Sequence, residues 1–230
     1  MENTETTAPA AATQRDYKLG IIAGILIGIL LLPILRAAKP ELYSKLALYV
    51  IPFFLAATPI GIWIASALAK KIAVIWQLAK FALIGGLNTV VDLGILAFIT
   101  FLFRNYLGIS SKDLLLGGLL GITFYSLFKG TSFIFANVNS YYWNKYWTFE
   151  HGAVKKTAAE FTQFFVVSVV GFVINVAIAS YIFKSVNPPG GLNSDQWGLI
   201  GAAAGSVAGL AWNFIGYKFV VFKKNESAQI

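Results

Sequence analysis

The sequence predicts an all-α fold, a polytopic membrane helical bundle. Of its 230 residues, 57% are hydrophobic and only 12% are charged, whereas soluble domains carry about 25% charged residues. The apolar residues gather in six runs that are long enough to cross a bilayer as helices. The last four runs contain an internal sequence repeat. We therefore expect six spans: an extra N-terminal helical hairpin and a four-span core of two parallel two-helix repeats.

The composition also excludes several kinds of function. The chain has no cysteine and one histidine, His151, so it lacks disulfides, thiolate ligands and a histidine pair for a metal site. It contains no phosphate-binding glycine loop, no G-x-G-x-x-G and no nucleophile elbow. We therefore expect neither an enzyme nor a cofactor. The net charge of +8 comes from basic residues at the ends of apolar runs, which favours membrane lipids over nucleic acid as partners.

The N-terminal residues are small and polar, without the basic and apolar segments of a signal peptide. We expect residues 1–18 to be a disordered cytosolic tail. An N-terminal transmembrane hairpin, 19–71, should follow, with spans at 19–35 and 46–69. The first of these is about 25 Å long as a helix, which is near the short limit for crossing a bilayer.

The third span, 81–103, carries a carboxylate near its middle. An ionisable group at that depth costs roughly 2.5–3.5 kcal/mol on insertion scales, so Asp92 should face protein or a wet cavity. Asn88 lies four residues earlier, on the same helix face. Two interpretations follow: a structural carboxylate bonded to Asn88 or Asn175, or a functional group in a polar groove.

The next apolar stretch, 114–146, is too long for one straight span. Either a helix begins near Phe124 after a re-entrant or interfacial piece, or it begins earlier and kinks at Gly130. The internal repeat favours the first alternative, because the pattern K-[YF]-[WV]-[TV]-F begins at Lys145 and again at Lys218.

The offset between these two lysines also relates the fourth span, 124–146, to the sixth, 197–219, and the fifth is 161–183. Each repeat holds two spans, so the repeats have the same orientation, and parallel repeats often enclose a groove. Asn175 in the fifth span matches Asp92 in the third. Glycines recur every four residues in the sixth span, a spacing typical of close helix packing; they are Gly201, Gly205 and Gly209.

Basic residues at the ends of the core spans predict the orientation. Nine lie on one side and four on the other, and cytoplasmic loops carry the excess. We therefore expect a protein integral to the cytoplasmic membrane with both termini cytosolic, including a short tail, 225–230. The nine are Lys70, Lys71, Lys80, Lys145, Lys155, Lys156, Lys218, Lys223 and Lys224, and the four are Arg104, Lys112, Lys129 and Lys184.

Several polar residues within the core are candidates for lipid-phosphate binding. Lys145 and Lys218 lie beside aromatic residues at the predicted cytosolic interface, where they act either as snorkelling anchors or as a phosphate cradle, with Asn144 as a hydrogen-bond donor. Lys129, near the outer end of the fourth span, either snorkels outward or receives an anionic headgroup. The candidates for lining a polar groove are Asn88, Asp92, Asn139, Asn175 and Asn213. The amides near the cytosolic end, Asn144 and Asn213, either bond across helices or form a track for a hydrated headgroup.

Four segments together resemble the GtrA-like family: F-x-x-x-G-G-x-N-T-x-x-D at 81–92, N-K-Y-W-T-F at 144–149, and the segments 164–175 and 213–222. This family of small four-span proteins is related to the membrane part of some dolichol-phosphate mannose synthases. The resemblance covers roughly 77–224. Two features depart from it: the family often has arginine where this chain has lysine at 145 and 218, and the first two spans have no counterpart.

The resemblance implies flipping of a polyprenyl-phosphate-linked monosaccharide, typically glucose on undecaprenyl phosphate, across the membrane for glycosylation of surface polysaccharide. A membrane glycosyltransferase is the implied partner, and a homo-oligomer is possible. Two other functions stay open from the residues: a scaffold that recruits a glycosyltransferase, and a small proton-coupled exporter that uses Asp92.

Overall fold

The computed structural model describes residues 12–116, 122–150, 158–191 and 194–223. The chain divides into two compact units, Met1–Thr148 and Phe149–Ile230, and each is described by itself. The first unit holds α1 (Gln14–Ala38), α2 (Pro40–Ala69), α3 (Val74–Tyr106) and α4 (Phe124–Trp143), the last continued by a π-helical turn, η2 (Asn144–Thr148). The second holds α5 (Ala158–Ser185) and α6 (Ser194–Gly216), continued by another π-helical turn, η3 (Tyr217–Val221).

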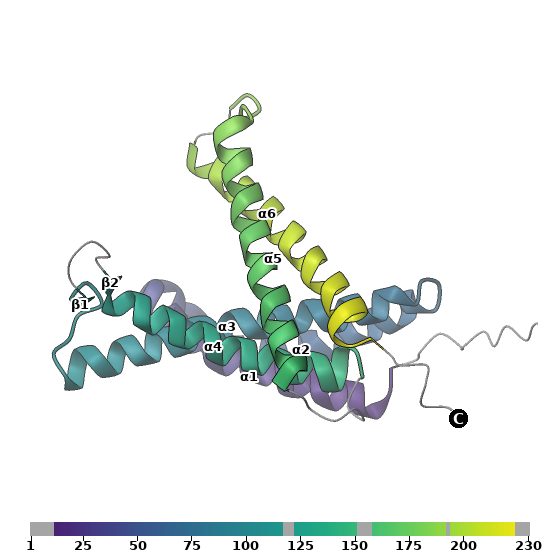
Figure 1. The fold of residues 1–230 in the computed structure, drawn as a ribbon. Coiled ribbons are helices and arrows are strands. Elements are labelled where there is room, and N and C mark those ends of the chain that lie inside the picture. The colour runs from purple at the N-terminus through teal and green to yellow at the C-terminus, as the bar shows by residue number, and fades with distance from the viewer. Residues whose placement is uncertain (1–11, 117–121, 151–157, 192–193, 224–230) are drawn as a thin grey trace, which may run out of the picture. The chain divides into compact units, whose positions relative to one another are not determined.

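The first unit is a layer of long helices packed around an apolar core (Figure 1). α1 packs against α2 and α3, and α3 packs against α4. At Gly24 of α1, an added Cβ would lie 2.7 Å from the carbonyl oxygen of Phe54, so the first hairpin is packed backbone to backbone. The core side chains come from α1, α2, α3 and η2; they are Ala23, Ile27, Ile62, Ala65, Ala69, Trp76, Ile84, Leu87, Val90 and Trp147.

The expected disordered tail is wrong for residues 14–18, which form the first turns of α1. Thr13 and Asp16 make a capping box, in which each residue's side chain accepts a hydrogen bond from the backbone N–H of the other. This arrangement satisfies N–H groups that a helix start leaves without partners. Residues 1–11 of the predicted tail lie outside the described part of the chain.

The helices extend beyond the apolar runs that predicted them. α2 begins at Pro40, a residue suited to the first helical turn, and α3 begins at Val74 instead of 81. In the described part of the chain, four helices are long and apolar enough to cross a membrane: α1, α2, α3 and α5. α4 and α6 are helices where spans were expected. The polar residues of α4 lower its hydropathy, so the six-span topology stays a prediction.

α4 begins at Phe124, which confirms the helix start inferred from the repeat. The described residues just before it form two short strands. Leu114–Leu116 (β1) pairs antiparallel with Ile122–Thr123 (β2). The all-α expectation therefore needs one small correction, a two-stranded ribbon between α3 and α4.

In the second unit, α5 and α6 lie side by side as a hairpin with very close backbones (Figure 1). A Cβ at Gly205 would lie 2.3 Å from the carbonyl oxygen of Asn175, and one at Gly209 would lie 2.8 Å from that of Gly171. Real Cβ atoms do not approach carbonyl oxygens this closely, so only glycine fits there. The predicted role of these glycines in helix packing is confirmed.

The two hairpins share local features at matching repeat positions. Both α4 and α6 end in a π-helical turn, and η2 and η3 are separated by the offset of the sequence repeat. Asp92 of α3 bonds to Ser132 of α4, and Asn175 of α5 lies against Gly205 of α6, which occupies the repeat position of Ser132. The sequence repeat thus corresponds to a repeated register within each hairpin, while a parallel arrangement of the two repeats stays a prediction.

Candidate functional site

The carboxylate in the middle of α3 is held by two side chains of α4. The ammonium of Lys129 contacts Oδ2 of Asp92, and the hydroxyl of Ser132 donates to Oδ1 at 2.6 Å. Ser132 is fully buried, whereas 22% of the Asp92 side chain and 40% of the Lys129 side chain are exposed. An ion pair with an added hydrogen bond lowers the cost of a carboxylate at this depth.

This pairing differs from the partners expected from the sequence. Asn88 and Asn175 were the candidate partners of Asp92, and Lys129 was expected to reach the outer surface or an outer headgroup. The packing of α3 against α4 places Lys129 one turn from Ser132, beside Asp92, so the two charges neutralise each other. Spacing along one helix predicts which face a residue occupies, but it does not give the register with the neighbouring helix.

Four of the predicted site residues each have a buried polar atom with no hydrogen-bond partner in the described structure. A buried polar group without a partner costs about 1–3 kcal/mol, so each of these atoms can gain from a hydrogen bond to water or to a ligand hydroxyl. Three belong to the first unit and one to the second. They are Oδ1 of Asn88, Nδ2 of Asn139, Oδ1 of Asn144 and Oδ1 of Asn213.

The two lysines at matching repeat positions both lie against aromatic rings. The ammonium of Lys145 is 5.6 Å from the ring centroid of Tyr141 and 3.3 Å from its hydroxyl oxygen, and the side chain has no exposed surface. The ammonium of Lys218 is 5.7 Å from the ring of Phe214 and 5.5 Å from that of Phe219. Aromatic faces stabilise cations at these distances, so both ammonium groups are oriented by their own helices, and phosphate binding stays a prediction.

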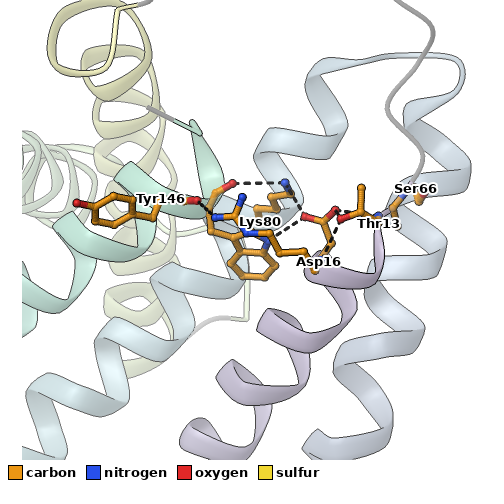
Figure 2. Close-up of polar contacts among 8 residues, drawn as sticks. Thr13, Asp16, Ser66, Lys80 and Tyr146 are labelled. Carbon is orange, nitrogen blue, oxygen red and sulfur yellow. Dashed lines mark hydrogen bonds and ion pairs between the residues drawn. The ribbon is translucent and has the colours of Figure 1, made fainter. Parts of the chain in front are cut away.

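A buried ionic cluster in the first unit was missed by sequence reasoning (Figure 2). The ammonium of Lys80 lies 2.8 Å from Oδ1 of Asp16, and both side chains are at most 6% exposed. The indole N–H of Trp147 donates to the same carboxylate oxygen at 2.9 Å. The hydroxyl of Thr13 donates to the other carboxylate oxygen at 2.6 Å.

Further contacts join the start of α1 to the other elements of this cluster. The backbone N–H of Ala12 donates to the Ser66 hydroxyl at 2.9 Å, and the guanidinium of Arg15 donates to the carbonyl of Tyr146 at 2.7 Å. The cluster thus ties α1 to α2, α3 and η2 (Figure 2). The T-x-x-D capping pattern at 13–16 was a visible signal for a helix start, but nothing in the sequence indicates that Asp16 contacts Lys80.

The described residues contain no group of three or more His, Cys, Asp or Glu side chains that could hold a metal ion. Comparison with known proteins adds one finding. The family model for the GtrA/DPMS transmembrane domain matches residues 80–222. No curated protein and no solved structure matches the chain.

Proposed function

The chain belongs to the GtrA/DPMS transmembrane-domain family and is an integral, multi-pass membrane protein, and we propose that it flips a polyprenyl-phosphate-linked monosaccharide across the cytoplasmic membrane. The product would serve glycosylation of a cell-surface polysaccharide. The observation that carries this proposal is the ion pair of Asp92 and Lys129, which lies near the middle of the 33-residue α3. A helix that only anchors a protein has no need of charges at that depth.

Polar side chains continue along the α3–α4 pair from this ion pair toward Lys80. Lys80 lies twelve residues before Asp92, which is about 18 Å along a helix, or more than half of the roughly 30 Å hydrocarbon core. Asn88 lies between these two positions on α3, and its Oδ1 is buried with no hydrogen-bond partner in the described residues. Oδ1 of Asn144, in η2, is also buried without such a partner. A headgroup moving along this pair of helices would find polar partners at several depths.

The energetic task is to replace water around the sugar and the phosphate. Each hydroxyl moved into hydrocarbon without a new hydrogen bond costs roughly 4–8 kcal/mol on a cyclohexane scale. The amides of Asn88, Asn139, Asn175 and Asn213 and the carboxylate of Asp92 would supply hydrogen bonds to the sugar. Lysine ammonium groups would contact the phosphate, first at the cytosolic side and then further along. They are Lys145 with the neighbouring Asn144, Lys218, and finally Lys129, which would exchange the Asp92 carboxylate for the phosphate.

The prenyl chain would stay in lipid while the headgroup crosses. The sequence has no nucleotide-binding motif, so consumption of the product on the outer side would supply the driving force. A membrane glycosyltransferase would make the substrate on the inner side, and a homo-oligomer of the chain is compatible with this scheme.

Leaflet-resolved transport in proteoliposomes tests the proposal. A short-chain polyprenyl phosphoglucose is incorporated into both leaflets, and membrane-impermeant periodate then oxidises the sugar in the outer leaflet. If the protein flips the lipid, periodate consumes the inner pool as well, at a rate proportional to the protein density. A rate equal to that of empty vesicles would overturn the proposal.

A scaffold that orients a glycosyltransferase is the second candidate. It is favoured by the burial of Lys145 against Tyr141, which keeps one predicted phosphate ligand from the surface. A scaffold would support glycosylation in cells without flipping lipid in vesicles. A proton-coupled exporter has less support, because Lys129 already neutralises the acid that would have to bind the cation.

A further inference from the structure

The N-terminal hairpin lies outside the region matched by the family, yet it forms a cavity with the start of that region. The cavity has a volume of about 280 Å³ and lies between α2 and α3, with Trp147 of η2 contributing to its wall. Its apolar walls include Phe54 and Ile62 from α2 and Leu83 from α3. Both helices are long and apolar enough to cross a membrane, so molecules that reach this cavity from the side are lipids.

The polar end of the cavity is electrically balanced. Lys80 lines it, and the ammonium of Lys80 lies 4.7 Å from the ring of Trp76 and 2.8 Å from the carboxylate of Asp16. Because this ion pair is internal to the protein, the cavity offers an anionic headgroup no net positive charge. The cavity therefore suits an apolar chain, which can pack against its aliphatic and aromatic walls.

We propose that this cavity holds a segment of the isoprenoid chain of the transported lipid. The identity of the chain rests on the proposed function; the presence of a chain site rests on the cavity. Ligand pockets for drug-sized molecules measure about 300–1,000 Å³, so the cavity takes one part of a polyprenyl chain and leaves the rest in lipid. Each isoprene unit carries a methyl branch, which makes a short segment bulky enough to fill a compact hollow.

The position of the cavity gives the extra hairpin a role in transport. α3 carries the cavity at Lys80 and Leu83 and, about three turns further on, the ion pair at Asp92. An isoprenoid chain bound in the cavity keeps its headgroup near the polar side chains of the α3–α4 pair. The headgroup can then move along α3 while the chain stays bound.

Photocrosslinking of the full chain in nanodiscs tests the site. The probe is farnesyl phosphate that carries a diazirine on its terminal isoprene unit, and mass spectrometry locates the adducts. Adducts are expected on α2 and α3 at the cavity walls, among them Phe54, Ile62 and Leu83. Unlabelled farnesyl phosphate should compete, whereas phosphatidylglycerol at the same concentration should not.

Gly61 allows the cavity to be filled from within. Gly61 lines the cavity, and a Cβ added there would meet no atom within 4 Å. The Cβ of a larger side chain therefore has room at this position. Gly61→Leu should reduce the cavity adducts to the level seen without irradiation, and Gly61→Ala should reduce them partly. Gly86→Leu is the matched control, because a Cβ at Gly86 also meets no atom within 4 Å but Gly86 does not line the cavity; its adducts should equal those of the unaltered protein.

The outcomes separate this inference from the proposed function. Wild-type flipping without cavity adducts, or with adducts that survive in Gly61→Leu, overturns the chain site and leaves the function standing. Cavity adducts in a protein that does not flip the lipid overturn the function and leave the chain site standing. Equal competition by phosphatidylglycerol overturns the assignment to an isoprenoid chain, because any membrane acyl chain would then occupy the cavity.

Discussion

The ion pair between α3 and α4 supports a charge-removal experiment in which stability and transport are expected to respond differently. Lys129→Met leaves Asp92 with only the hydroxyl of Ser132 as a partner. Asp92→Asn leaves Lys129 without its counter-ion. The double variant Asp92→Asn/Lys129→Gln removes both charges and keeps two hydrogen-bonding side chains of similar size.

The structure predicts unequal costs for the two single variants. An unpaired carboxylate near the middle of a span costs about 3 kcal/mol on insertion scales, which lowers the ratio of folded to unfolded protein by roughly a hundredfold. An unpaired Lys129 should cost less, because 40% of its side chain is exposed and its long stem can move the ammonium toward an interface. The double variant should recover to within about 1 kcal/mol of the unaltered protein, since no uncompensated charge remains.

Two measurements on the same preparations check this prediction. Thermal unfolding in detergent, followed by size-exclusion chromatography, should rank the unaltered protein and the double variant above Asp92→Asn, with Lys129→Met lowest. The periodate assay in proteoliposomes should give the double variant a flipping rate near that of empty vesicles, although the protein is folded. Loss of transport in a stable protein is what a direct contact with the headgroup requires.

Either of two results would refute the reasoning. Equal stability of Lys129→Met and the unaltered protein would show that Asp92 does not depend on Lys129. A double variant that is stable and flips lipid at the normal rate would show that the ion pair only fastens α3 to α4, and the charge at mid-helix would then carry no argument for transport.

Two further predictions concern the packing of the helices. Gly205→Leu and Gly209→Leu should each destabilise the α5–α6 hairpin by about 1–3 kcal/mol, because the new side chains meet backbone carbonyls. Gly86→Leu is the control. Normal melting temperatures for Gly205→Leu and Gly209→Leu would contradict the close approach of the two helices. Asp16→Ala should lower the free energy of unfolding by about 3–5 kcal/mol, because it leaves the Lys80 ammonium buried without its carboxylate. Thr13→Ala should lower it by only about 1 kcal/mol, through loss of the helix cap. Equal melting temperatures for these two variants would contradict the buried ion pair.

Much of the fold was predictable, because hydrophobic runs and a repeat report on local structure. The start of α4 at Phe124 followed from the offset of the repeat, and the contact of Gly205 with α5 followed from its regular spacing with other glycines. Both inferences use signals that lie within one helix or one hairpin. The early start of α1 was also within reach of the sequence, because Thr13 and Asp16 have the spacing of a capping box.

The partners of buried charges could not be predicted in the same way. Asp92 was placed correctly as a group that needs shelter, but its contact with Lys129 depends on the register of α3 against α4. Asp16 and Lys80 lie far apart along the chain, with the whole of α2 between them, and Lys80 was interpreted only as a charge at the end of a span. Pairing over such separations depends on how whole helices pack, which composition and periodicity do not determine.

The buried ion pair at Lys80 changes how the family-matched region should be understood in this chain. The match begins at residue 80, and the carboxylate that neutralises this first residue is Asp16, in a helix outside the match. A buried ammonium without a counter-ion is costly, so in this protein the four-helix region is not energetically independent of α1. The N-terminal hairpin is therefore an integral part of the first unit, and a function assigned to the matched region alone would leave out a residue that stabilises it.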